Sequence, residues 1–265
     1  MKTALTIAGS DPTGGAGLQA DLKVFRAFGV HGTSVISAIT AQNTEGVFSI
    51  LRVEKLFLEK QLNTLLSDIR PHATKLGMLY SKDAVEVLSK KIKKYPLKNL
   101  VIDPIIISST GISLVENETI DALREKLFPS SKIITPNIYE AHVLTGITIT
   151  DEKAMKDAAR ILKKMGPEVV VITGGHLDKT AVDLYYDGDF HIIKGAKIRG
   201  EYHGTGCVFS AAITALLALG YIPLEAVMKA KKYVNNSIKK AHYPGKGMGL
   251  LHIQHMFLNP NNEIE

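Results

Sequence analysis

The sequence contains no tryptophan, only one cysteine and no apolar run long enough to cross a membrane. One cysteine cannot form an internal disulfide, which is atypical of small secreted domains. The N-terminus has one lysine, a very short apolar run and then glycines, so it does not resemble a secretory signal. The longest apolar stretch, residues 207–219, is shorter than the roughly 20 residues that a spanning helix needs. These absences predict a cytoplasmic protein and argue against a membrane role.

The chain also lacks an arginine-rich arm and any motif that interleaves aromatic and basic residues, although its formal net charge is +6. Its lysines gather on predicted helices, notably at 90–94 and 229–240, where they complement helix carbonyls or face solvent. A positive charge of this kind also suits a phosphorylated substrate. We therefore expect no nucleic-acid partner.

The composition is that of a globular protein, with 45% hydrophobic and 22% charged residues in 265. No repeat, low-complexity segment or linker divides the chain, so we expect one domain over residues 1–265. Strand-like runs rich in Val, Ile and Leu alternate with helical patterns along most of the length. This alternation predicts an α/β fold of three layers, with helices on both faces of a mostly parallel central sheet.

The predicted elements follow from these runs. Strands are expected near 3–8, 33–40, 74–78, 100–103, 132–135 and 168–173. Helices are expected near 18–28, 54–69, 82–94, 116–127, 137–144, 152–164, 205–219 and 224–242. Two stretches are typical of hairpins: residues 181–194, which turn at Asp187-Gly188 and suit an antiparallel edge, and the Ser/Thr/Gly segment 105–114. The second is either a small lid over a pocket or a long polar loop.

Polar residues and glycines follow most of the predicted strands. Parallel sheets bind ligands outside the carboxyl ends of their strands, so these residues are candidates for a site. They are Gly9-Ser10-Asp11, Gln42-Asn43, Asp103, Asn137 and Thr173-Gly174-Gly175-His176.

The first predicted helix carries an unexpected carboxylate. Gly14, Gly15 and Gly17 precede it and form either a tight turn or a backbone approach to a ligand, since they match neither a dinucleotide fingerprint nor a P-loop. Asp21 interrupts the apolar stripe of this helix. A buried carboxylate needs a partner, so Asp21 either faces a ligand pocket or is solvated because the stripe is rotated.

The segment Asn137-Ile138-Tyr139-Glu140 has the spacing of a helix cap. In one interpretation Asn137 and Glu140 form a capping box that satisfies helix amides. In the other they hold a hydrated metal and phosphate oxygens at the mouth of the sheet, with Asp103 as a second carboxylate on the metal.

The segment His203-Gly204-Thr205-Gly206-Cys207 carries the clearest signal for chemistry. Two glycines flank a hydroxyl where a helix of small and apolar residues begins, so backbone N–H groups converge on an anion there. A lone cysteine is usually a small hydrophobic residue, but at a helix N-terminus the helix dipole and the adjoining amides favour its thiolate.

Together these motifs resemble the hydroxymethylpyrimidine and phosphomethylpyrimidine kinases of thiamine biosynthesis, within the ribokinase-like superfamily. The resemblance covers nearly the whole chain. It is carried by Ala-Gly-Ser-Asp-Pro at 8–12, Gly-Gly-Ala-Gly at 14–17, Gln-Ala-Asp-Leu-Lys at 19–23, Thr-Ala-Gln-Asn-Thr at 40–44, Leu-Gly-Met at 76–78, Asp-Pro at 103–104, Thr-Pro-Asn at 135–137, Glu-Ala at 140–141, Gly-Gly-His at 174–176 and His-Gly-Thr-Gly-Cys at 203–207.

The resemblance implies ATP-dependent phosphorylation of 4-amino-5-hydroxymethyl-2-methylpyrimidine and then of its monophosphate, with Mg²⁺ and in a homodimer. The roles that it implies are these: Cys207 as the catalytic base, with Gly204, Thr205 and Gly206 as an anion hole; Gly9, Asp21, Gln42 and Met78 around the pyrimidine; Asn137, Thr173, Gly175 and His203 at the nucleotide; and Asp103 and Glu140 at the metal.

Two departures from the family pattern bear on this assignment. Thr173 stands where the family usually has a lysine expected to touch nucleotide phosphates, and Met248 and Leu250 stand where His and Pro are common. Pyridoxal or pyridoxine kinase is the alternative activity, although the predicted lid has no cysteine to trap an aldehyde. A catalytically silent nucleotide-binding regulator of the same fold is the second alternative.

Overall fold

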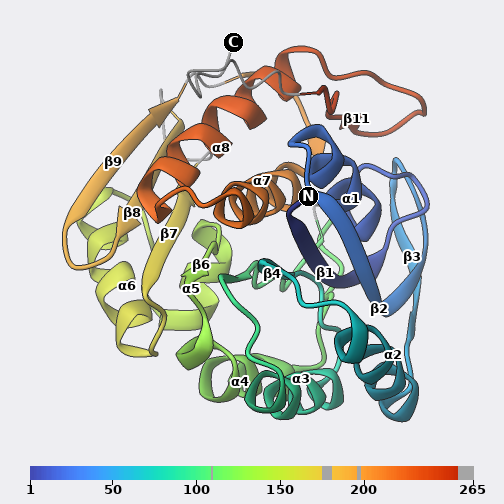
Figure 1. Cartoon of the computed structure of the whole chain (residues 1–265). Coiled ribbons are helices and arrows are strands. Elements are labelled where there is room, and N and C mark those ends of the chain that lie inside the picture. The colour runs from blue at the N-terminus through green and yellow to red at the C-terminus, as the bar shows by residue number, and fades with distance from the viewer. Residues whose placement is uncertain (109, 175–180, 196–197, 256–265) are drawn as a thin grey trace.

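A nine-stranded sheet runs through the computed structural model, which describes residues 1–108, 110–174, 181–195 and 198–255. Its strand order is β3-β2-β1-β4-β5-β6-β7-β8-β9. The six strands from β2 to β7 in this order are parallel, whereas β3, at one edge, is antiparallel to β2 and the β8–β9 hairpin, at the other, is antiparallel to β7. Helices α1, α7 and α8 cover one face, and α2 to α6 cover the other (Figure 1). The predicted α/β class and its three layers are confirmed.

The elements have the following bounds. The strands are β1 (Thr3–Ser10), β2 (His31–Asn43), β3 (Gly46–Arg52), β4 (Ala73–Leu76), β5 (Leu100–Ile102), β6 (Ile133–Ile134), β7 (Val169–Gly174), β8 (Ala181–Tyr186), β9 (Phe190–Gly195), β10 (Tyr202–His203) and β11 (Gly249–Leu250). The helices are α1 (Gly17–Ala27), α2 (Lys55–Asp68), α3 (Lys82–Lys94), α4 (Asn117–Lys126), α5 (Ile138–Thr145), α6 (Glu152–Lys164), α7 (Thr205–Leu219) and α8 (Pro223–Lys239), with a 3-10 turn at Phe128–Ser130.

Helix α7 is the central helix of its layer because it is apolar on every side. Twelve of its 15 residues are buried, as expected for a helix without a polar face. It packs against α1 and α8 and begins close to the carboxyl ends of the parallel strands. Its burial therefore holds the 203–207 turn in a fixed position relative to the sheet.

Strand β3 was not predicted from the sequence. Phe48 and Leu51 on this edge strand are 71% and 67% exposed, whereas Val47 is buried in a small apolar cluster against which Ile50 packs, so the strand has no regular alternation of apolar and polar residues. Strand β2 also runs three residues beyond its predicted end, to Asn43. This extension keeps Gln42 within the β2–β3 ladder, opposite Val47 and just before the turn to β3.

Two short segments close over the carboxyl edge of the sheet. Residues 105–114 contain a bridge between Ile107 and Ser113, and their apolar ends Ile105 and Leu114 pack with Met78. This packing favours the lid over the polar loop. The glycine-rich tail returns as β11, which pairs in parallel with β10 and so lies beside His203.

Candidate functional site

The 203–207 turn meets the loop after β1 through an approach that only glycine allows. Gly204 has φ +81° and is the N-cap of α7, and a Cβ on it would lie 1.9 Å from the carbonyl oxygen of Gly15. The amides of Thr205, Gly206 and Cys207 begin the helix and have no intrahelical acceptor. The turn thus has the helix-start amides that an anion site requires, and the binding of an anion there stays a prediction.

Asp103 lies opposite this turn, directly after β5. A Cβ on Gly206 would lie 3.9 Å from Asp103 Oδ2, and the Ser210 hydroxyl donates to the same oxygen at 2.9 Å. Burial raises the pKa of Asp103, although the charge of Lys75 and the Ser210 hydroxyl both act to lower it. A carboxylate is thus aimed at the mouth of the anion site.

Beneath the turn, Asp21 forms a fully buried ion pair with Lys75 of β4. The Thr6 hydroxyl donates to Asp21 Oδ2 at 2.6 Å, and Lys75 Nζ donates to the carbonyl oxygen of Cys207 at 3.3 Å. Burial alone would lower the pKa of Lys75, but the charge of Asp21 and its hydrogen bond to the ammonium group raise it. The solvated alternative for Asp21 is wrong, because a buried lysine compensates its charge. Its place in the pyrimidine pocket stays a prediction.

The ionisation expected for Cys207 is wrong in this structure. Burial raises the pKa of its thiol to about 12, and the charges of Asp103 and Asp21 act in the same direction. Lys75 and the amide of Gly17 act to lower the pKa. Desolvation outweighs the favourable amides and dipole of α7, so Cys207 is a neutral thiol at pH 7 when no ligand is bound.

Asn137 and Glu140 form the predicted capping box at the start of α5. Asn137 Oδ1 accepts from the Glu140 amide at 2.9 Å, and Glu140 Oε2 accepts from the Asn137 amide at 2.8 Å. Burial, together with the nearby charge of Asp103, raises the pKa of Glu140 to about 8. The capping interpretation is confirmed, and it leaves a second buried carboxyl group close to Asp103.

This pKa predicts that the ligand-free protein becomes less stable between about pH 5 and pH 8. An unfolded glutamate has a pKa of about 4.3, so folded Glu140 retains a proton over this window that the unfolded chain has lost. The stabilising effect of protonated Glu140 is complete below the pKa of the unfolded state. It is lost as the pH rises through the pKa of Glu140 in the folded state. Urea unfolding at several pH values measures the slope, which is at most about 1.4 kcal/mol per pH unit.

Glu140→Gln should flatten that slope, because the amide oxygen still caps α5 but does not titrate. The exposed Glu201 provides the matched control, and Glu201→Gln should leave the slope unchanged. An unaltered slope in Glu140→Gln contradicts the prediction.

The predicted nucleotide residues Asn137 and Thr173 lie side by side in an isolated parallel bridge. Thr173 pairs across the β7–β8 ladder with Asp183, whose Oδ1 accepts from the Gly174 amide at 3.1 Å. Lys231 of α8 forms an ion pair with Asp183 Oδ2 at 2.6 Å. A lysine from another element therefore lies close to the position where Thr173 replaces the family lysine. Gly175 falls outside the described residues.

The predicted pyrimidine residues lie at the ends of β1, β2 and β4. A Cβ on Gly9 would lie 3.2 Å from Met78 Cε, so these two residues are in contact. Gln42 lies farther along β2, at the wall of a cavity of about 510 Å³ between the loop after β1, the β2–β3 turn and the tail. The other residues lining this cavity are Pro12, Thr13, Asn43, Thr44, Glu45, Pro244, Gly245, Lys246 and Leu250.

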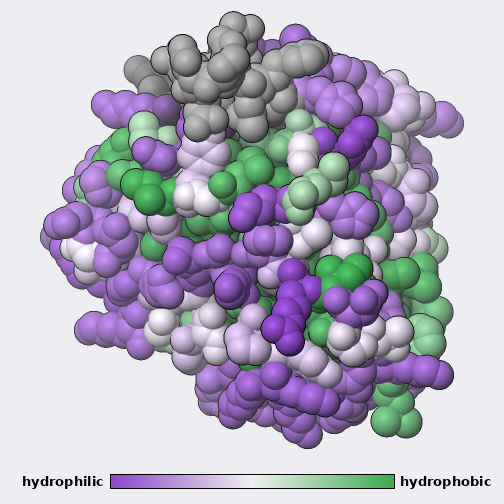
Figure 2. All heavy atoms as spheres, in the orientation of Figure 1, coloured by the Kyte–Doolittle hydropathy of each residue, from purple (hydrophilic) through white to green (hydrophobic). Residues whose placement is uncertain are grey.

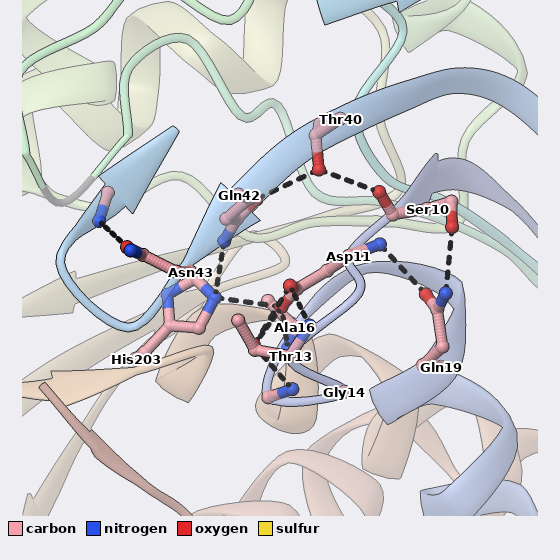
Figure 3. Close-up of polar contacts among 12 residues, drawn as sticks. Ser10, Asp11, Thr13, Gly14, Ala16, Gln19, Thr40, Gln42, Asn43 and His203 are labelled. Atoms are coloured by element: carbon pink, nitrogen blue, oxygen red, sulfur yellow. Dashed lines mark hydrogen bonds and ion pairs between the residues drawn. The ribbon is translucent and has the colours of Figure 1, made fainter. Parts of the chain in front are cut away.

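His203 lies with the predicted pyrimidine residue Gln42 and not beside Thr173. Its Nε2 is 2.9 Å from Gln42 Nε2 and 2.9 Å from Asp11 Oδ2 (Figure 3). Asp11 also accepts from the amides of Thr13 and Ala16. The described structure thus joins His203 to the predicted pyrimidine side, while its predicted nucleotide role has no contact that supports it.

Comparison with known proteins places this arrangement in a family. The model of the phosphomethylpyrimidine kinase family matches residues 11–252. The chain belongs to this family. It is therefore a kinase, and this class of reaction implies ATP as co-substrate.

Similar proteins agree with this membership. The hydroxymethylpyrimidine/phosphomethylpyrimidine kinase of Bacillus subtilis is 42% identical over 250 residues, 93% of this chain and 92% of the relative. The bifunctional thiamine biosynthesis protein ThiED of Geobacter sulfurreducens is also 42% identical over 92% of this chain, which spans only 51% of that longer protein.

Solved structures show the same fold in two kinds of vitamin kinase. The phosphomethylpyrimidine kinase of Clostridium difficile is 44% identical, with a TM-score of 0.80, over 90% of this chain and 100% of that one. The pyridoxal kinase of Staphylococcus aureus, in complex with pyridoxal, is 33% identical, with a TM-score of 0.90, over 100% and 97% of the two chains.

Sequence reasoning missed several residues of this kinase site, namely Lys75, Asp183, Ser210 and Lys231, and it named Asp11 as a candidate without a role. Lys75 had a usable signal, because a lysine within a short apolar strand is a natural partner for the carboxylate on the stripe of α1. Asp183 and Lys231 had none. They lie 48 residues apart in sequence and meet only because α8 packs beside the β8–β9 hairpin.

Proposed function

We propose that this chain phosphorylates 4-amino-5-hydroxymethyl-2-methylpyrimidine and then its monophosphate, with ATP, in thiamine biosynthesis. The observation that carries the proposal is that the 203–207 turn lies against Asp103 through Gly206 and contacts Gln42, at the wall of the cavity, through His203. The names of the relatives support the same substrates. A cytoplasmic location also stays a prediction; no helix among the described residues has the length and apolarity to span a bilayer.

The arrangement suits phosphoryl transfer to an alcohol. The amides of Gly204, Thr205 and Gly206 would bind the anionic group in flight, and charge neutralisation and alignment dominate the barrier for such a transfer. Cys207 lies at the base of the same turn, where it would accept the hydroxyl proton once ligands change its surroundings. Lys75 would support that change, since its charge acts to lower the pKa of the thiol.

Mg²⁺ fits the carboxyl groups at the mouth of the turn. Asp103 and Glu140 are each 4% exposed, and burial raises the pKa of both. A divalent cation would compensate two buried carboxylates that lie too close to ionise easily together. The described residues contain no cluster of three or more His, Cys, Asp or Glu that could hold a metal, which suits Mg²⁺ because it is commonly bound by one or two carboxylates plus phosphates and water. When bound, Mg²⁺ would neutralise phosphate charge.

The second phosphorylation is the step that Thr173 puts to the test, because Thr173 stands where the family usually has a lysine expected to touch nucleotide phosphates. Lys231 forms an ion pair with Asp183, which lies opposite Thr173 in the β7–β8 ladder and accepts from the Gly174 amide. The charge of Lys231 would therefore supply positive potential at this edge of the sheet. We therefore propose that the monophosphate is also a substrate. The turnover of the monophosphate relative to that of the hydroxymethylpyrimidine measures how well Lys231 compensates for the missing family lysine.

A coupled ADP-release assay tests the function with three acceptors: the pyrimidine, its monophosphate and pyridoxal. Turnover of the first two supports the proposal. Turnover of pyridoxal alone favours the alternative, for which the pyridoxal kinase fold of S. aureus is the supporting likeness. No turnover with any acceptor overturns the enzymatic proposal and favours a regulator of the same fold.

Gln42→Leu should raise the KM for the pyrimidine by at least about tenfold while the KM for ATP changes little. Leucine removes the bonds to one ring edge and leaves the polar groups of the ring unpaired. Steady-state kinetics with each substrate varied in turn measures both constants. Equal losses for the two substrates contradict the assignment.

We also propose that the protein is a homodimer formed through the edge of the sheet. Ile39, Phe48, Leu51, Leu56 and Phe57 are 46–82% exposed and belong to β2, β3 and α2. Figure 2 shows hydrophobic surface on the right-hand side of the molecule, where Figure 1 places β3 and α2. A patch of this kind on an edge strand is typical of an interface.

Phe48→Lys combined with Leu51→Lys should therefore halve the mass found by sedimentation equilibrium, because two charges cannot be buried in an apolar contact. Met228→Lys on α8, where Met228 is 54% exposed, is the matched control and should leave the mass unchanged. A wild-type protein that is already monomeric contradicts the proposal.

A further inference from the structure

One ring nitrogen of His203 has two polar neighbours that make opposite demands. Nε2 lies 2.9 Å from Gln42 Nε2, an amide nitrogen that can only donate, and 2.9 Å from Asp11 Oδ2, a carboxylate oxygen. A ring nitrogen carries either a proton or a lone pair. It therefore cannot accept from Gln42 and donate to an ionised Asp11 at the same time.

The surroundings of Asp11 decide which demand is met. Its Oδ1 accepts from the Thr13 amide at 2.9 Å, and its Oδ2 accepts from the Ala16 amide at 2.8 Å. Donors on both oxygens stabilise the charged carboxylate. His203 Nε2 must then carry a proton and donate it to Asp11. The buried Nδ1 of His203 has no hydrogen-bond partner among the described residues, so Nε2 is the ring nitrogen that makes the polar contacts.

A second conflict lies at the other end of the Gln42 amide. The single proton of the Thr40 hydroxyl would have to serve both the carbonyl oxygen of Ser10, at 2.9 Å, and Gln42 Oε1, at 3.1 Å. Turning the amide by 180° replaces the donor–donor contact at His203 with one in which Asp11 Oδ2 and the Gln42 oxygen share the Nε2 proton, and it frees the Thr40 proton for Ser10. The amide oxygen then accepts from His203 Nε2, its NH₂ donates to the Thr40 hydroxyl, and that hydroxyl donates to Ser10.

We infer that Asp11 and His203 are positioning residues that orient the Gln42 amide, with its oxygen toward His203 and its NH₂ toward Thr40, and so determine which way round the acceptor ring binds. This inference rests on the proposed pyrimidine substrate. The oriented amide offers an acceptor on the His203 side and a donor on the Thr40 side. The edge of an aminopyrimidine ring presents a donor, the amino group, beside an acceptor, the ring nitrogen. This edge complements the Gln42 amide only when the amino group faces the amide oxygen on the His203 side and the ring nitrogen faces the NH₂ on the Thr40 side.

The ring orientation matters because of where the reacting group is attached. In the proposed substrate the hydroxymethyl group is on the carbon next to the one that carries the amine. With the amine toward His203, the hydroxymethyl group lies on the side of the 203–207 turn, which holds the anion site and Cys207. With the amide reversed, the ring would bind with its hydroxymethyl group directed away from that turn.

The protonation of His203 tests the network without any assay of activity. In ¹⁵N-labelled protein at neutral pH, long-range ¹H–¹⁵N correlation spectra, assigned with His203→Gln, report which ring nitrogen carries a proton. A proton on Nε2, alone or with one on Nδ1, supports the inference. A proton on Nδ1 alone overturns it, because Nε2 would then accept from the Gln42 NH₂.

Kinetics tests the consequence. His203→Phe should raise the KM for the pyrimidine by about tenfold, as expected when an oriented hydrogen bond is lost, with the KM for ATP within about twofold. His203→Gln should restore most of the loss, because a terminal NH₂ donates to both Asp11 and Gln42. A merely structural role would lower kcat and leave both KM values unchanged. An equal rise in the KM for ATP returns His203 to the nucleotide and overturns the inference.

Thr40→Val removes the contact at the other end of the amide and should also raise the KM for the pyrimidine. Thr33→Val, on the same strand, is the matched control, since the Thr33 hydroxyl donates to the carbonyl oxygen of Ala4 away from the pocket. If the wild-type protein does not phosphorylate the pyrimidine, the proposed function fails. The spectra of His203 then still decide the orientation of Gln42.

Discussion

Cys207→Ala is expected to lower kcat by at least about 10²-fold with little change in the KM for the pyrimidine, as for loss of a general base. The side chain lies at the start of α7, in the same turn as the proposed anion site, and Lys75, Asp103 and Asp21 are the charged groups that act on it. Alanine leaves the amides of the turn in place. Steady-state ADP release with the pyrimidine varied measures the two constants.

Cys207→Ser is the matched control for packing, because serine has nearly the same size as cysteine but a far weaker acid. If Cys207 acts through its proton, serine should be about as slow as alanine. If it only fills space, serine should be close to the wild type. Near-normal turnover in the alanine variant contradicts the catalytic role.

The raised pKa of the free thiol adds a dependence on pH. Because the free protein holds Cys207 as a thiol with a pKa of about 12, kcat/KM should rise from pH 7 to pH 9 as the thiolate fraction grows. Cys207→Ala should lose this part of the profile. A wild-type profile that is flat over the same range would show that the proton goes elsewhere.

Lys75→Met is expected to destabilise the protein by about 3–5 kcal/mol, the loss typical of a broken buried ion pair. Asp21 would keep its buried carboxyl group but lose the compensating charge, and Cys207 would lose the donor to its carbonyl oxygen. Urea unfolding measures the change in the free energy of unfolding. Removing the second charge in Asp21→Asn/Lys75→Met should restore part of the loss.

Lys91→Met is the matched control for this prediction. Lys91 of α3 is also buried, but its partner Glu59 has a side chain that is 43% exposed and stays solvated when the lysine is removed. We expect a loss of about 1 kcal/mol or less there. Comparable losses at Lys75 and Lys91 would contradict a special cost for the Asp21–Lys75 pair.

Local pattern was enough for most of the fold and for the anion turn. Helices α3, α6 and α7 have the predicted bounds, because α3 and α6 are strongly amphipathic and begin after the caps Ser81 and Asp151, while α7 is one apolar run between Gly204 and Gly220. The glycines of the 203–207 turn and the capping box at Asn137 depend on residues close together in sequence. Strand β3 was missed because its apolar and polar residues do not alternate, and because Phe48 and Leu51 are exposed at the edge of the sheet.

Partners distant in sequence were not predictable in the same way. Asp21 showed that a counter-charge must exist, but only the pairing of β1 with β4 brings Lys75 to it. His203 was expected at the nucleotide because the family resemblance implied that place. The packing of Gly204 against Gly15 instead directs its ring to Asp11 and Gln42.

For the 203–207 turn, the sequence by itself determined the anion site, since two glycines at the start of an apolar helix suffice to expose converging amides. Only the tertiary structure decided the state of Cys207 and the neighbours of His203. Local amides and the helix dipole favour a thiolate, but the ionisation of a buried group depends on all the charges and the solvent that folding brings near it or removes. Those belong to strands and loops far away in the chain.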